Sequence, residues 1–342
     1  MKGGNMKFIW NRYMLGVALI HVLGLFALFT VAPAHPAFVG MGIAAYVFGV
    51  RHAFDIDHIA AVDNTIRKLV AQKKDSRGVG FFFSLGHSTV VFLLAVLTTI
   101  SVRFVAKHMS GMQEIGGIIG VTVSGVFLLF LAVLNFMLFA QLWRTFRRIR
   151  EDRIGEAELE EMFEAKGFFT RYLGKWFKLV TKSRHIYPIG FLFGLGFDTA
   201  TEISLLTMSA GAANQQVPVM GIIALPLLFA AGMSLFDTLD GLMMTKSYAW
   251  ASDRPVRKVY YNLIVTAISV IAAVAVGAVE LAQITTEKLH LSGGIWDMIA
   301  GIDFGNLGIF LVVAFLAIWG VAVFIWKVYR IEERYAVKGK SL

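Results

Sequence analysis

The stretch Gly49–Leu69, GVRHAFDIDHIAAVDNTIRKL, places a cluster of ionisable side chains inside an apolar run that is long enough to cross a membrane. The cluster consists of Arg51, His52, Asp55, Asp57, His58 and Asp63. A charged side chain at the centre of a bilayer costs about 2.5–3.5 kcal/mol on insertion scales, so it is kept where it pairs, lines a wet cavity or holds a cation. Two His and three Asp within the twelve residues 52–63 are a ligand set that suits a divalent metal ion.

The composition predicts an all-α polytopic membrane protein. Of 342 residues, 57% are hydrophobic and 16% are charged, whereas soluble domains carry about 25% charged residues. The apolar segments are continuous runs of about 20 residues, which favours helices over the short alternating strands of a β-barrel. Cysteine is absent, which excludes disulfides and thiolate metal sites and disfavours Cu(I). Nickel, cobalt, manganese, iron and zinc remain open.

Hydropathy predicts eight transmembrane helices in a single transmembrane domain covering residues 1–342. The predicted spans are 12–32, 37–64, 79–101, 117–140, 186–210, 219–245, 259–284 and 306–327. We interpret the first span as a retained helix rather than a signal peptide, because its apolar run exceeds the usual 7–15 residues.

The distribution of basic residues predicts the orientation of these spans. Of the 32 Lys and Arg residues, 28 fall at the two ends of the chain and in alternate connections, against three in the other connections. The positive-inside rule therefore places both termini in the cytoplasm. We accordingly interpret the net charge of +9 as a topology signal with some attraction to anionic lipid, and not as a sign of nucleic-acid binding.

Residues 141–185 form the only sizeable connection. We interpret this segment as a cytoplasmic loop with an amphipathic helix lying on the membrane surface, because basic residues (Arg171, Lys175, Lys178, Lys182) share one helical face and apolar residues another.

Further polar residues fall inside other predicted spans. They are His87 in span three, Asp198 and Glu202 in span five, and Asp237 and Asp240 in span six. Counted along the spans at 1.5 Å per residue, all lie between the midplane and the inner half of the bilayer, so we expect them to share one site with the cluster of span two. Each carboxylate pair is spaced i,i+4 or i,i+3 and shares a helical face.

The candidate metal ligands are His52, Asp55, Asp57, His58 and His87. On an ideal helix Asp57 points away from Asp55, so either the helix unwinds there or Asp57 supports the ligands from behind. His87 could instead form an interhelical hydrogen bond.

The remaining ionisable residues are assigned to the transport path or to supporting roles. They are Arg51, Asp63, Asp198, Glu202, Asp237 and Asp240. Arg51 is expected to neutralise a carboxylate, with Asp240 as one candidate partner, and Asp63 could cap the helix or reach the interface.

The strings AFDIDHI and GFDTATEI are alike and lie on spans predicted to run in opposite directions. This similarity suggests an inverted repeat of spans 2–4 and 5–7, with the site at its interface.

The motifs RHAFDIDHI with AAVDNT, LGHSTVV, LGFDTATEI and GMSLFDTLD resemble, in order, the four signature motifs of the nickel/cobalt transporter (NiCoT) family. The chain has Ile56 where Ala is usual in the first motif. The resemblance implies high-affinity uptake of Ni²⁺ or Co²⁺ across the bacterial cytoplasmic membrane. It also implies that His52, Asp55, Asp57 and His58 are critical, with His87 and the other motif carboxylates as candidates.

No Walker A motif is present, so the chain itself does not hydrolyse ATP. We expect a secondary transporter driven by the membrane potential or a proton gradient, which is not an enzyme and needs no cofactor and no ATPase subunit. Three alternatives stay open: an exporter of the same metals, a membrane-embedded metalloenzyme and a cation channel. Exporters often carry a His-rich loop, whereas residues 141–185 contain only His185, and no H-E-x-x-H sequence occurs.

Overall fold

The computed structural model describes residues 12–100, 102–151, 180–196, 199–215, 217–252, 255–302 and 307–328. All regular elements in these ranges are helices. They are α2 (Arg12–Val31), α3 (Phe38–Ala53), α4 (Ile56–Ala71), α5 (Val79–Ile100), α6 (Val102–Arg150), the 3₁₀ helix η2 (Ser183–Ile186), α9 (Tyr187–Gly194), α10 (Ala200–Asn214), α11 (Val219–Ser252), α12 (Pro255–Lys288), α13 (Ile295–Ala300) and α14 (Leu307–Val328). The all-helical class is confirmed for this part of the chain.

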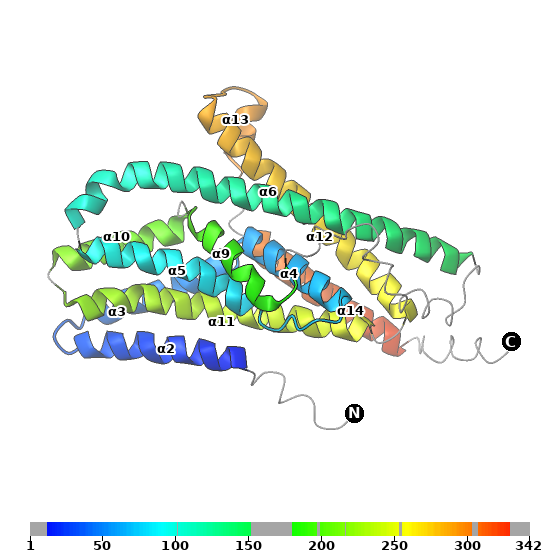
Figure 1. Ribbon diagram of the computed structural model, residues 1–342, viewed down its shortest axis with the longest axis horizontal. Helices are drawn as coiled ribbons and strands as arrows, with labels where there is room; N and C mark the ends of the chain where they lie inside the picture. The colour runs from blue at the N-terminus through cyan, green and yellow to red at the C-terminus, as the bar shows by residue number, and fades with distance from the viewer. Residues whose placement is uncertain are drawn as a thin grey trace.

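Five of these helices, α2, α5, α6, α11 and α12, are long and apolar enough to cross a membrane, and α3 and α14 contain shorter apolar stretches. Figure 1 shows α2, α3, α5, α10 and α11 lying roughly parallel, with α6 running along the side of the stack that is away from α2. Large apolar side chains such as Phe26 (62% exposed) and Ile271 (68%) cover the outside of the bundle. A face of this kind is typical of contact with lipid.

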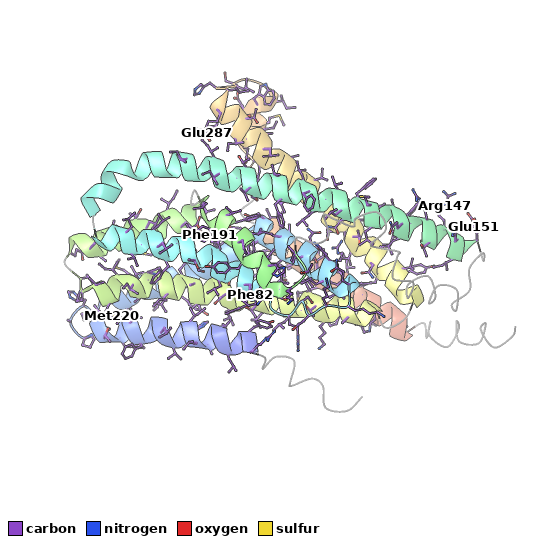
Figure 2. The ribbon with its side chains drawn as sticks, viewed as in Figure 1. Phe82, Arg147, Glu151, Phe191, Met220 and Glu287 are labelled. Carbon is purple, nitrogen blue, oxygen red and sulfur yellow. The ribbon has the colours of Figure 1, made fainter. Side chains whose placement is uncertain are left out.

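The two ends of the bundle differ in their side chains. Met220, near the start of α11, lies at the end where α2 meets α3 and α10 meets α11, and Arg147 and Glu151 lie at the opposite end (Figure 2). The start of α2 and the end of α14 both face the end that carries Arg147 (Figure 1).

Two of the predicted spans are wrong as continuous helices. The predicted span 37–64 is divided into α3 and α4 by Phe54 and Asp55, and α4 continues to Ala71. The predicted span 186–210 is divided into α9 and α10, which end and begin at Gly194 and Ala200. Asp55 and Thr199, which precede the second halves, have nearly the same extended backbone (φ −67°, ψ 141° and φ −70°, ψ 144°). Hydropathy detects an apolar run but not an interruption within it, because the interrupted backbone is buried in protein.

The cytoplasmic loop predicted for 141–185 also needs correction. Helix α6 continues through Arg150, so the first ten residues of that segment extend a helix. The proposed surface helix falls mainly on residues 152–179, which lie outside the described residues.

Helix α11 approaches α3 and α5 so closely that the contacts require glycine. A Cβ atom added at Gly49 of α3 would lie 2.0 Å from the carbonyl oxygen of Phe229, and one added at Gly80 of α5 would lie 1.8 Å from that of Asp237. Small residues let helix backbones meet in this way in membranes. The contacts fix α11, and with it Asp237, against the helices that carry the site.

Candidate metal centre

Three histidines from three helices meet inside the bundle. His52 lies in the last turn of α3, His58 in the first turn of α4, and His87 in the middle of α5. Their ring centroids are 4.6–4.8 Å apart, and one ring nitrogen of each lies within 4.8 Å of those of the other two. All three are buried, with exposures of 3% or less. The break between α3 and α4 makes this possible, because it turns both His52 and His58 toward α5.

Glu202 of α10 joins two of these histidines. His87 Nε2 lies 2.9 Å from both His52 Nε2 and Glu202 Oε1, and His52 Nε2 lies 3.9 Å from the same oxygen. Two imidazole nitrogens and one carboxylate oxygen therefore face one small buried volume. Such groups are costly to bury unless a proton or a cation lies between them.

A second layer of polar groups holds His52. Asp55 Oδ2 lies 3.1 Å from His52 Nδ1, and Asp55 Oδ1 accepts a 2.6 Å hydrogen bond from Arg51. Thr201 Oγ1 lies 3.2 Å from the same ring nitrogen. An imidazole that donates its Nδ1 proton to a carboxylate presents its Nε2 lone pair to a metal, so this arrangement prepares His52 as a ligand. Arg51 pairs with Asp55, as expected of a residue that neutralises a carboxylate, and Asp240, one candidate partner, is not its partner.

The residues that precede α4 and α10 do not cap these helices with their side chains. Asp and Thr at such positions normally cap the helix, yet neither Asp55 nor Thr199 makes a side-chain cap hydrogen bond. Asp55 instead contacts His52, and Thr199 Oγ1 donates to Glu202 Oε2 at 2.8 Å. Both side chains therefore serve the site at a cost in helix capping.

His58 is oriented by a carboxylate from another helix. Its Nδ1 lies 3.4 Å from Asp237 Oδ2 of α11, and its ring packs edge-on against Phe83 with centroids 4.8 Å apart. Its Nε2 is buried and has no hydrogen-bond partner among the described residues. A buried imidazole nitrogen without a partner is available as a metal ligand.

A cavity of about 500 Å³ reaches this cluster from one side. Its lining includes Arg51, His52, Asp55, Asp57, His87 and Glu202, together with Ser124, Thr199, Thr201, Glu280 and Gln283. Asp57 Oδ1 accepts a 2.9 Å hydrogen bond from the backbone N–H of His58, so it caps the start of α4 while its side chain borders the cavity. The cavity gives a small ion access to a buried cluster of nitrogen and oxygen ligands.

Asp63 belongs to a different cluster. It accepts hydrogen bonds from Arg67 at 2.7 Å, Tyr248 at 2.5 Å and Ser269 at 2.8 Å, and all four residues are buried. This network ties α4 to α11 and α12. Asp63 is therefore neither a cap nor a residue that reaches the interface.

Asp240 lies on α11 one helical turn beyond Asp237 and interacts electrostatically with both Asp237 and Asp63. Both of its carboxylate oxygens are buried and lack a hydrogen-bond partner within the described ranges. Asp198 lies outside the described residues, so its predicted place in the path stays a prediction.

Several residues in the site, at its cavity or in the neighbouring Asp63 cluster are missed by the sequence analysis. Arg67 falls in a segment predicted as a loop, because the apolar run ends before α4 does. Glu280 could have been found, since it is an ionisable residue inside the predicted span 259–284. Thr199 and Thr201 give no signal, because hydroxyl side chains are common in membrane helices.

The donor set fits a borderline divalent cation. It combines three imidazoles with the carboxylate of Glu202 and contains no sulfur, since the chain has no cysteine. Imidazole suits zinc, copper, iron and nickel, whereas magnesium and calcium prefer oxygen alone.

The chain is similar to known nickel- and cobalt-transport proteins. The family model described as NicO, high-affinity nickel-transport protein, matches residues 38–325. The chain is 49% identical over 332 residues to the nickel transporter NixA of Staphylococcus aureus, covering 97% of this chain and 98% of that protein. It is 44% identical over 326 residues to the high-affinity nickel-transport protein NixA of Helicobacter pylori strain J99, covering 94% and 97%. It is 38% identical over 312 residues to the cobalt transport protein NhlF of Rhodococcus rhodochrous, covering 89% and 88%. No solved structure gives a significant match.

Proposed function

Because the chain belongs to the NicO family of high-affinity nickel-transport proteins, we propose that it imports Ni²⁺ with high affinity across a bacterial cytoplasmic membrane. Cobalt is the second candidate cargo, since one relative with 38% identity is named a cobalt transport protein. The metal is the transported substrate, and the protein acts as a secondary transporter without an enzymatic reaction of its own.

The proposed binding site is centred on His52, His87 and Glu202, with His58 as the fourth ligand. The observation that carries this proposal is the meeting of three buried imidazoles from α3, α4 and α5 within 4.8 Å of one another. Asp55, expected from the sequence to be a ligand, is assigned to positioning His52 instead, because it is already engaged by that ring and by Arg51. Asp57 is assigned to the cavity through which the ion would approach the site.

The proposed topology has eight membrane crossings, with α3–α4 and α9–α10 each forming one interrupted crossing. Both termini lie in the cytoplasm, as the basic residues indicate. The similar backbone before α4 and α10 supports an inverted repeat in which spans 2–4 and 5–7 each contribute one interrupted helix.

The proposed direction of transport is inward. The cavity would admit the ion from outside to the histidine cluster, and Asp237 and Asp240 would carry it onward. The membrane potential can drive this movement, since a doubly charged ion gains about 4.6 kcal/mol per 100 mV moving inward.

The direct test is accumulation of ⁶³Ni²⁺ and ⁵⁷Co²⁺ at nanomolar concentration in cells that lack their own importers. Wild type is compared with His58→Ala and with a control, His290→Asn, at an exposed position where φ is +51° and Asn is tolerated. Accumulation by wild type and the control, but not by His58→Ala, supports import through this site. Lower accumulation than in empty cells identifies an exporter, and no difference from empty cells rejects transport of these metals.

A further inference from the structure

Glu280 of α12 is an acidic residue for which the proposed binding site has no role. It lines the cavity that also exposes His52, His87 and Glu202, on a wall that residues of α6 and α12 build (the α6–α12 wall). Its Oε2 accepts a 2.9 Å hydrogen bond from Ser124 of α6. The carboxylate is therefore held in place at the cavity and not left to swing into solvent.

The residues next to Glu280 border the far end of the cavity. Gln283, one turn along α12, donates from Nε2 to the carbonyl oxygens of Ile299 (3.0 Å) and Ile302 (2.9 Å). Ile302 itself lines the cavity, so these bonds hold the segment after α13 against this wall. In the proposed orientation this connection faces the outside, so Glu280 lies on the part of α12 that leads toward the outside.

The cavity is larger than a bare cation requires. Six water molecules at about 30 Å³ each occupy about 180 Å³, well within the volume of about 500 Å³. The cavity therefore has room for a divalent cation with its water shell, and a carboxylate on the α6–α12 wall can bind that shell before the ligands replace it.

The charges that line the cavity favour the binding of a hydrated cation. Arg51 lines the cavity and pairs with Asp55, and the carboxylates of Asp57, Glu202 and Glu280 also line it, with Glu202 against His87. Glu280 is the acid among them that comes from the α6–α12 wall. A cleft in which charges of one sign predominate raises the local concentration of the opposite ion and its rate of association by about 10-fold or more.

We propose that Glu280 is a capture residue, which binds the hydrated divalent cation through its water ligands on the way to the histidine cluster. This inference rests on the proposed function. It predicts that Glu280 controls how fast dilute metal reaches the site, and not how tightly the site holds it.

The test measures initial rates of ⁶³Ni²⁺ uptake against concentration for Glu280→Gln, alongside equilibrium nickel binding to the purified full-length chain. We expect KM to rise about tenfold, with the maximal rate and equilibrium Kd unchanged. Glu280→Asp, which keeps the charge, should have a KM close to that of wild type. Glu280→Ala is a second variant without the charge and should show the same rise in KM as Glu280→Gln.

The matched control is Glu287→Gln, two turns along α12. Its side chain is 70% exposed and pairs with Lys288, and it lies at the end of α12 near α13 (Figure 2). This variant should leave KM unchanged.

An unchanged KM in Glu280→Gln and Glu280→Ala would overturn the proposal. An equal weakening of equilibrium binding would also overturn it, because Glu280 would then be a ligand. A wild-type chain that takes up no metal would instead reject the proposed function.

Discussion

The Nε2 atoms of His52 and His87 lie 2.9 Å apart, although the two side chains come from α3 and α5 and are 35 positions apart in the chain. Two imidazole nitrogens can approach this closely only when one carries a proton toward the other or when a cation replaces that proton. Glu202 faces the same point. In the proposed function a divalent cation binds between these groups.

Removing either histidine of this pair should abolish tight nickel binding. Loss of a group that supports a ligand typically costs 10–100-fold in metal affinity, so loss of a ligand in His52→Ala or His87→Ala should cost about 100-fold or more. Isothermal titration of the purified chain measures this effect. An affinity for nickel within a few-fold of wild type in both variants would rule out the pair as ligands.

Asp55→Asn tests a positioning role. Asn keeps the shape of the side chain but loses the charge that holds His52 Nδ1 and Arg51, so nickel affinity should fall by about 10–100-fold and not disappear. The same titration distinguishes this partial loss from the full loss expected of a ligand. A loss as large as that of His52→Ala would identify Asp55 as a ligand after all.

Arg67→Ala should destabilise the protein. It leaves Asp63 buried without its counter-ion, which costs about 3–5 kcal/mol in the free energy of unfolding. Unfolding of the purified chain in detergent measures this change. A variant as stable as wild type would show that the network contributes nothing to the fold.

The matched control for that prediction is Arg77→Ala. Arg77 pairs with Asp75 between α4 and α5, where both side chains are exposed, and surface pairs contribute about 0–1 kcal/mol. The hydrogen bond from Arg77 holds the pKa of Asp75 below its usual range. The small stability from this pair is therefore present at neutral pH and is lost as the pH falls through the lowered pKa of Asp75.

Gly80→Ala tests the close packing of α5 on α11. The added Cβ would meet the backbone oxygen of Asp237 at 1.8 Å, and backbone cannot yield as a flexible side chain can. We expect a loss of about 1–3 kcal/mol in unfolding free energy and weaker nickel binding, since Asp237 contacts His58. Gly40→Ala is the control, because a Cβ there meets nothing within 4 Å and alanine favours a helix. Equal effects of the two substitutions would contradict this account of the packing.

The sequence predicts much of this arrangement because charge is expensive in a membrane. The ionisable residues His52, His58, His87 and Glu202 stand out from apolar surroundings, and all four meet in the structure. The alternative that the helix unwinds near Asp57 is confirmed by the break at Phe54 and Asp55.

Other features depend on tertiary contacts that no local pattern encodes. The break before Thr199 lies in an apolar run that reads as one helix, and only its contacts with His52 and Glu202 explain it. The sequence likewise does not predict that Asp55 positions His52 whereas Glu202 faces the histidine pair, because both are carboxylates at a similar predicted depth in the bilayer. Arg67 falls between the predicted spans 37–64 and 79–101, and its buried partners Tyr248 and Ser269 lie more than 180 positions away.

The most direct test of the central claim is nickel K-edge X-ray absorption on the purified chain loaded with one Ni²⁺ per molecule. The account predicts multiple-scattering features of two or three imidazoles with oxygen ligands, and the loss of one imidazole in His87→Ala. A spectrum of oxygen ligands without imidazole, or one that His52→Ala and His87→Ala both leave unchanged, would contradict the binding of nickel at the histidine cluster.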